Sequence, residues 1–109
     1  MTGPRYDFEA KLWLHGGQAG WTFLTLPGEV SDDIEARTSH RSTAFGSVRV
    51  RVTVGRTEWA TSLFPDKRSQ AYLLPVKKAV RRAERLNEGD DVAVSLVIVG
   101  DDESMDPSF

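Results

Sequence analysis

Two runs of alternating residues, joined by the dipeptide Gly55-Arg56, constrain the fold of this chain more than any other feature. In Ser47–Val54 every second residue is valine, and the residues between the valines are polar or basic. The run Thr57–Phe64 alternates in a similar way. A period of two residues is typical of a strand with one buried face, and a two-residue link that contains glycine favours a tight hairpin turn. The sequence therefore predicts a β-hairpin whose valines line a core.

Four other segments show strand character, because they are rich in branched and aromatic residues and are bounded by glycine, proline or polar residues. They are Tyr6–Leu14, Trp21–Leu26, Ala71–Leu74 and Asp91–Val99. In the first of them, Trp13 is expected to face outward. Together with the hairpin, these segments predict about six strands.

Two short helices complete the predicted fold. Acidic residues follow Ser31, which favours an N-cap at this serine and a helix over Asp32–Thr38. Pro75 is expected to open the second helix, because its fixed φ is harmless in a first turn. Apolar residues recur at helical spacing over Val76–Leu86, and the exposed surface of this helix would be basic, with Lys77, Lys78, Arg81, Arg82 and Arg85.

The chain of 109 residues is expected to form a single domain, residues 1–109, with one core over about residues 5–99. We expect Met1–Pro4 to be a frayed tail and the acidic residues 100–109 to be disordered. Cysteine is absent, which excludes disulfides, a thiolate nucleophile and cysteine-based metal sites. No long apolar run is present, so we expect a soluble cytoplasmic protein that neither is secreted nor spans a membrane.

The net charge of −2 is distributed very unevenly. Residues 1–36 carry a net −4, residues 37–86 a net +9, and residues 87–109 a net −7. A basic middle between acidic ends can form a face that binds anions. It can equally be neutralised by the ends within one fold, which is the interpretation that we prefer, because strands distant in sequence often become neighbours in a small barrel.

Several of these stretches resemble one family of domains. They are the runs 45–55, 59–67, 72–81 and 89–92, together with Leu12-Trp13, 20–23 and Leu26-Pro27. They are similar to the DUF1905 domain, a bacterial and archaeal family of unknown function, and the resemblance covers nearly the whole chain. It implies a mainly β fold, a small closed double-psi-like β-barrel with short helices at its ends. The resemblance transfers no catalytic residue.

Arg85 departs from the pattern of that family, in which glycine is expected before Leu86. The end of the second helix must therefore be capped in another way, for which Asn87 is a candidate.

Motifs for catalysis or cofactor binding are weak. The loop Gly16-Gly17-x-x-Gly20 joins two predicted strands and opens no helix, so it fits neither phosphate-binding fingerprint and is interpreted as a turn. His15 and His40 have no carboxylates at ligand spacing, and we expect neither a metal site nor a cofactor. Asp66 and Lys67 could transfer protons if a pocket shifted their pKa values. A serine hydrolase is not indicated, because no Gly-x-Ser-x-Gly nucleophile elbow surrounds any of the serines. An enzyme is therefore a minor hypothesis.

The leading hypothesis is a non-enzymatic binding module for a small anionic ligand or a protein partner. Closed barrels place pockets at their mouths, here at the loop Pro65–Gln70. The candidate ligand-binding residues are Arg49, Arg51, Asp66, Lys67 and Tyr72. A homomeric or other interaction role also stays open.

Nucleic-acid binding is the alternative hypothesis. It would use the basic surface of the second helix, formed by Lys77, Lys78, Arg81 and Arg82, because phosphate contacts need clustered cations. The acidic isoelectric point of about 5.6 weighs against it. So does the expectation that Trp13 and Trp59 are the only exposed aromatic side chains.

Overall fold

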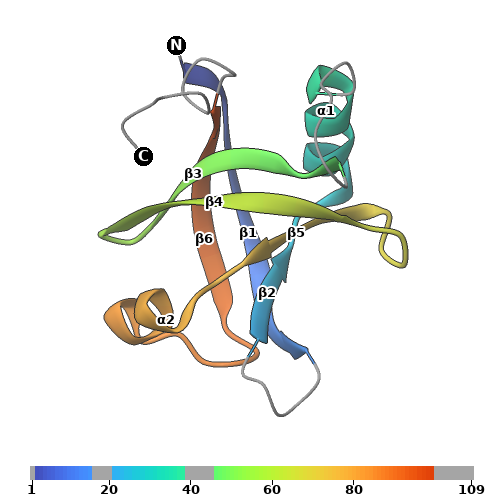
Figure 1. The fold of residues 1–109 in the computed structure, drawn as a ribbon. Helices are drawn as coiled ribbons and strands as arrows, with labels where there is room; N and C mark the ends of the chain where they lie inside the picture. The colour runs from blue at the N-terminus through green and yellow to red at the C-terminus, as the bar shows by residue number, and fades with distance from the viewer. Residues whose placement is uncertain (1, 16–20, 39–45, 100–109) are drawn as a thin grey trace.

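The computed structural model describes residues 2–15, 21–38 and 46–99. The glycine-rich turn 16–20, the segment 39–45 that contains His40, and the C-terminal residues 100–109 lie outside the described residues. The elements, in chain order, are β1 Thr2–His15, β2 Trp21–Thr25, α1 Gly28–Thr38, β3 Val48–Val54, β4 Thr57–Asp66, β5 Ala71–Pro75, α2 Lys78–Glu84 and β6 Asp91–Val99 (Figure 1).

The six strands form a closed barrel in the order β1-β2-β5-β4-β3-β6. All the described strand pairs are antiparallel. The predicted hairpin is present, since Val54 pairs with Thr57 across the turn at Gly55 and Arg56. The small closed β-barrel with about six strands and two helices is therefore confirmed.

Two long strands belong to both halves of the barrel. β1 pairs with β6 from Thr2 to Lys11 and with β2 from Leu12 to His15. β4 pairs with β3 through its first part and with β5 through Phe64–Asp66. These strands bend the sheet at opposite sides, which closes the barrel without leaving an edge. The frayed tail predicted for residues 1–4 is wrong for Thr2–Pro4, which lie in β1.

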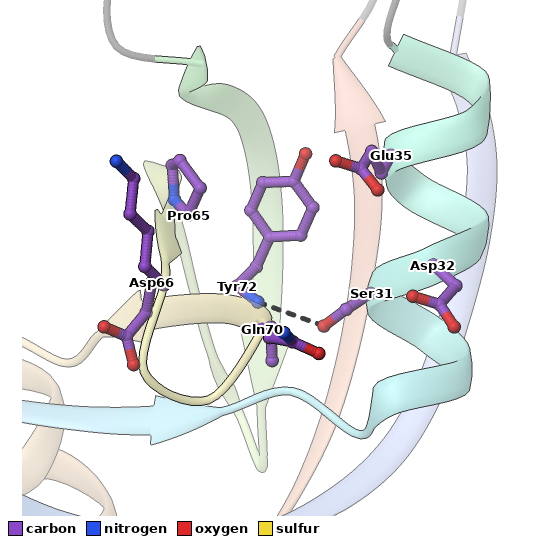
Figure 2. Close-up of a pocket in the computed structure, with 9 residues that line it drawn as sticks. Ser31, Asp32, Glu35, Pro65, Asp66, Gln70 and Tyr72 are labelled. Atoms are coloured by element: carbon purple, nitrogen blue, oxygen red, sulfur yellow. Dashed lines mark hydrogen bonds between the residues drawn. The ribbon is translucent and has the colours of Figure 1, made fainter.

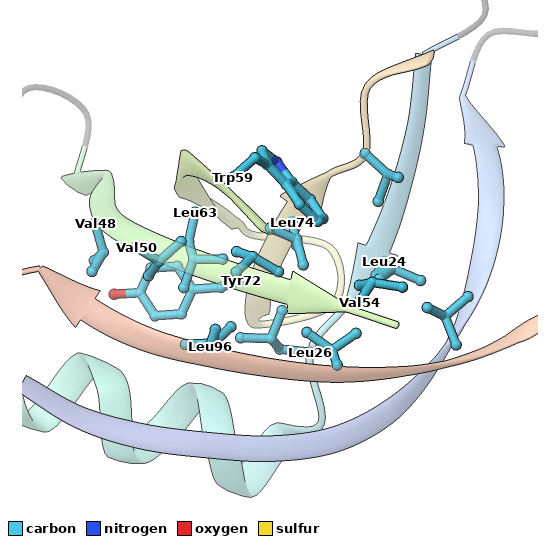
Figure 3. Close-up of a cluster of buried hydrophobic side chains, with 14 of the residues drawn as sticks. Leu24, Leu26, Val48, Val50, Val54, Trp59, Leu63, Tyr72, Leu74 and Leu96 are labelled. Atoms are coloured by element: carbon cyan, nitrogen blue, oxygen red, sulfur yellow. The ribbon is translucent and has the colours of Figure 1, made fainter. Parts of the chain in front are cut away.

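The inside of the barrel is filled by the alternating apolar residues of all six strands (Figure 3). On β3 the burial pattern is strictly alternating: Val48, Val50, Val52 and Val54 are buried, and Arg49 and Arg51 are exposed. Leu63, Leu74 and Leu96 are fully buried opposite them. Trp59 is also buried, with 8% of its surface exposed, so the expectation that it is exposed is wrong; it shares the inward face of β4 with Leu63.

Helix α1 begins earlier than predicted, at Gly28, and ends at Thr38 as expected. The Ser31 N–H already donates to the Pro27 carbonyl oxygen at 2.9 Å, as in a helix, so the predicted N-cap at Ser31 is wrong. Ser31 and Ile34 are buried against the barrel. In Figure 1 the two helices lie at opposite ends of the barrel.

Helix α2 is shorter than predicted and spans Lys78–Glu84. Pro75 does not open it but ends β5. Its C-terminus is closed by Arg85, which adopts the left-handed conformation with φ 55° and ψ 48°. The Arg85 N–H then donates to the Arg82 carbonyl oxygen, and the Leu86 N–H to that of Arg81 at 2.9 Å, the pair of bonds that glycine usually enables at a helix end.

Asn87 is therefore not the cap that the sequence suggested. Its N–H instead donates to the Asp90 carboxylate in the turn before β6, at 2.8 Å.

In the part of the chain that the structure describes, no helix is long and apolar enough to cross a membrane.

Candidate functional site

An open pocket of about 370 Å³ lies between α1 and the connection from β4 to β5. Figure 2 shows α1 on one side, the ends of β4 and β5 on the other, and the ring of Tyr72 between them. The pocket is lined by Ser31, Asp32, Glu35, Pro65, Asp66, Lys67, Gln70, Ala71 and Tyr72. Its size is within the range of pockets that hold small molecules.

One wall of the pocket is the face of α1 that carries Asp32 and Glu35. The buried Ser31 hydroxyl oxygen accepts a hydrogen bond from the Tyr72 N–H at 3.0 Å, which ties the helix directly to β5. Ile34 is buried beneath the same helix. With Ser31 and Ile34 facing the barrel, Asp32 and Glu35 lie on the exposed part of the helix surface, where their carboxylates border the pocket.

A second set of bonds fixes α1 to β1. The Tyr6 hydroxyl donates to the Asp33 carboxylate, and the Arg37 Nε donates to the same oxygen at 2.9 Å. Burial, together with this bond, raises the pKa of Tyr6 from 10.0 to about 12. The hydrogen bonds from Tyr6 and Arg37 hold the pKa of Asp33 below its usual value. α1 is therefore anchored on two sides, and the pocket wall is pre-formed.

The other wall is the turn between β4 and β5. The Asp66 carboxylate accepts hydrogen bonds from the Ser69 hydroxyl at 2.8 Å and from the Ser69 N–H at 3.3 Å. These bonds, that of the Ser69 hydroxyl first, lower the pKa of Asp66. Gln70 closes the turn with a positive φ of 54°. Asp66 is thus held as a charged carboxylate near neutral pH, which suits an electrostatic anchor and does not suit a proton donor.

The charges of the pocket differ from those that the sequence suggested. Among its lining residues are three carboxylates, on Asp32, Glu35 and Asp66, and one ammonium group, on Lys67. Fixed negative charge favours cations and hydrogen-bond donors over anions. The anionic ligand expected at this mouth of the barrel therefore matches the pocket poorly.

The structure brings together three of the five predicted ligand-binding residues, namely Asp66, Lys67 and Tyr72. Arg49 and Arg51 do not line this pocket. Because the valines of β3 point inward, both arginines project from the outside of the barrel. The Arg49 Nη1 lies 3.5 Å from the Ser62 hydroxyl oxygen on β4.

The predicted basic surface forms at the opposite end of the barrel. Lys77, Lys78 and Arg82 are exposed, and Arg81 is half-buried. A depression of about 290 Å³ runs along this helix and is lined by Lys78, Arg81, Arg82, Arg85, Leu86 and Asn87. Lys77 does not line the depression but lies in extended backbone just before α2.

Sequence reasoning missed Ser31, Asp32 and Glu35 as pocket residues. Ser31 before a run of acids has the appearance of a helix cap, and this interpretation leaves no role for the acids beyond the helix dipole. The available signal was helical spacing: Asp32 and Glu35 are three residues apart and share one face of α1.

Metal ligands are not grouped in the part of the chain that the structure describes, where no cluster of three or more histidine, cysteine or acidic residues could hold an ion. His15 lies within an aromatic cluster, with its ring centroid 5.9 Å from that of Trp13 and 6.1 Å from that of Phe23. His40 lies outside the described residues.

The fold and the pocket define a small closed β-barrel domain whose ends are covered by two helices and whose one mouth carries an acidic pocket. The family comparison agrees with the resemblance found from the sequence. Residues 8–96 match the family model described as "Domain of unknown function (DUF1905)". The match covers most of the chain, which therefore belongs to the DUF1905 family. No protein with a curated description matches the sequence.

Proposed function

We propose that this domain is a binding module for a small ligand that carries positive charge or donates hydrogen bonds, and that the ligand occupies the pocket between α1 and the β4–β5 turn. The observation that carries the proposal is the charge of that pocket. Asp32 and Glu35 come from α1, and Asp66 comes from the other wall. A cation between these walls would contact carboxylates from both sides.

The construction of the pocket supports this proposal. Both walls are fixed before any ligand arrives, one by the Ser31–Tyr72 hydrogen bond and the other by the Asp66–Ser69 bonds. A pre-formed site loses little conformational entropy when it binds, which favours affinity for a small molecule. Asp66 keeps its charge because its pKa is lowered, so it holds the ligand by electrostatic attraction.

The test is a thermal-shift titration at low salt with three probes: spermidine as a cation, glucose as a neutral hydroxyl donor, and citrate as an anion. At ten times the dissociation constant, a ligand that binds only the folded state adds about 1.4 kcal/mol of stability, which shifts the midpoint by roughly 5–10 °C for a domain of this size. We expect such a shift with spermidine or glucose and none with citrate.

The double variant Asp32→Asn, Glu35→Gln removes two of the pocket charges without touching the hydrogen bonds that hold the walls. It should weaken spermidine binding by about tenfold or more. Glu58→Gln is the matched control, because Glu58 is an exposed acid on β4 that does not line the pocket. A larger shift with citrate than with spermidine, or equal losses in the double variant and the control, would contradict the proposal.

A further inference from the structure

The outside of the barrel carries a regular grid of side chains across β1, β2, β5 and β4. The strand register places Trp13 opposite Phe23 and Phe23 opposite Pro75. The next row on the same face runs from Thr25 to Leu73 and on to Phe64, and a third row pairs His15 with Trp21. Directly opposed residues of neighbouring strands share one face. We call these outward residues the aromatic face; they are Trp13, His15, Trp21, Phe23, Leu73 and Phe64.

The rings of the aromatic face are accessible to solvent. Trp21 is 60% exposed and Phe64 is 44% exposed, and these are the exposed large apolar side chains of the described residues. In the row next to Trp21, the ring centroids of Trp13 and Phe23 lie 5.3 Å apart, and the indole N–H of Trp13 donates to the Thr25 hydroxyl oxygen at 2.9 Å. The half-buried rings are thus held in place beside exposed ones.

A lysine stands at one end of this face. The Val76 N–H donates to the Thr22 carbonyl oxygen at 2.9 Å, and the Thr22 hydroxyl donates to the Val76 carbonyl oxygen at 2.7 Å. These bonds continue the β2–β5 register by one step, and the backbone at Lys77 is still extended. Lys77 therefore comes to lie opposite Trp21, with an exposed side chain.

An arginine stands near the other end. Arg49 pairs with Ser62 on β4, and Phe64 lies two residues further along the same face of that strand. A diagonal neighbour at this separation is within reach of a long side chain. None of the six residues of the aromatic face is a carboxylate. Two acids lie at its border: Asp66 accepts hydrogen bonds from Ser69, and Asp91 forms an ion pair with Lys11 at 3.1 Å.

We propose that the aromatic face binds single-stranded nucleic acid, with bases stacked on Trp21 and Phe64 and phosphates at Lys77 and Arg49. Exposed rings beside cations, on a face none of whose own residues is a carboxylate, are the combination that single strands require, because every base has a ring face and every phosphate a charge. The lack of exposed aromatics that weighed against nucleic acid in the sequence does not apply to this structure. None of the residues of the aromatic face lines the acidic pocket, although Asp66 borders both surfaces, so the two proposals are tested by different variants.

The experiment measures fluorescence anisotropy of a labelled thymidine oligonucleotide of about 12 nucleotides at roughly 50 mM salt, where phosphate contacts are strong. We expect saturable binding that Trp21→Ala and Phe64→Ala each weaken by about tenfold. Trp21→Phe should restore most of the affinity, because it keeps a stacking ring. Lys77→Gln should reduce the slope of log affinity against log salt by about 0.7.

Arg56→Gln is the matched control for Lys77→Gln, because Arg56 is exposed at the β3–β4 turn, away from the aromatic face. It should leave the affinity within about twofold. The proposal is overturned by the absence of binding at low salt. It is also overturned if duplex DNA competes for the protein as well as the single strand does. A third contradicting result is an equal loss of affinity in Lys77→Gln and Arg56→Gln with no loss in Trp21→Ala or Phe64→Ala. If Trp21→Ala instead dissociates a dimer in sedimentation and no oligonucleotide binds, the face joins two copies of the chain and the proposal fails.

Discussion

Among the glycines that the structure describes, Gly55 is the one at which an added methyl group would meet the closest neighbour. The glycine has a φ of +59°, and a Cβ atom there would lie 2.0 Å from the Glu84 Oε1. That carboxylate accepts hydrogen bonds from the Thr57 hydroxyl at 2.7 Å and from the Arg56 N–H at 3.2 Å. Gly55→Ala therefore forces the carboxylate away from the hairpin turn as well as straining the backbone.

The expected cost has two parts. A non-glycine residue in the left-handed region costs about 1–2 kcal/mol, and loss of the two bonds to the partly exposed Glu84 carboxylate costs about 1 kcal/mol more. The sum of about 2–3 kcal/mol would lower the melting temperature by about 10 °C or more. Urea denaturation followed by tryptophan fluorescence measures the free energy of unfolding directly.

A double-mutant cycle separates the two parts. In the Glu84→Ala background the carboxylate is already gone, so Gly55→Ala should cost only the backbone strain, about 1–2 kcal/mol. Gly28→Ala is the control, because nothing lies within 4 Å of a Cβ atom at Gly28. If Gly55→Ala costs the same in both backgrounds, the carboxylate is not displaced and the reasoning about the turn is refuted.

Three further predictions concern the helices. Arg85→Gly should raise the free energy of unfolding by about 0.5–1 kcal/mol in urea denaturation, because glycine adopts the left-handed φ of 55° without strain; a loss of stability would contradict this. Ser31→Ala should lower it by about 1–3 kcal/mol, because the buried N–H of Tyr72 loses its acceptor, and an unchanged urea midpoint would show that this bond does not anchor α1. Tyr6→Phe should lower the melting temperature most between about pH 5 and pH 9. Below that window, the bond stabilises the wild type less as the pH falls, because the Asp33 carboxylate, whose pKa is lowered in the folded state, becomes protonated. Above the window, the bond stabilises the wild type less as the pH rises from the ordinary Tyr6 pKa of 10.0 to the raised value of about 12, because the phenol loses its proton. Melting curves across the pH range check this, and a constant difference at all pH values would contradict it.

The barrel could be predicted from the sequence because its strands alternate without ambiguity. On β3 the inward residues are all valines and the outward ones are polar or basic, so a single register buries the valines. The family pattern also marked Arg85 as unusual, and the structure gives the reason, since a glycine-like backbone is needed there.

Strand β2 shows where the alternation fails. Trp21 and Phe23 face outward, and Leu24 is buried. Because both faces of the strand carry large apolar side chains, the two-residue period does not predict which face packs against the core. The exposure of Trp21 was missed for this reason. On β4, by contrast, alternation already placed Trp59 beside Leu63, and its burial follows from that pattern.

The acidic pocket had no local signal in the sequence. Asp32 and Asp66 are separated by more than thirty residues, and they line one pocket because α1 packs against the barrel, in part through the bond from the Tyr72 N–H to Ser31. A contact between a helix side chain and a distant strand depends on tertiary packing, which short-range patterns do not contain. Arg49 and Arg51 were assigned to the pocket from their charge, although their alternation with the valines places them outside the barrel.

The sharing of β1 and β4 between the two halves of the barrel has a consequence for cooperativity. Neither half can open without breaking a strand that the other half also needs. The amide protons of all six strands should therefore exchange through one global opening, with a common free energy. A ligand at the helix-bordered pocket or on the outer sheet face would then slow exchange across the whole barrel, including amides on the side it never touches.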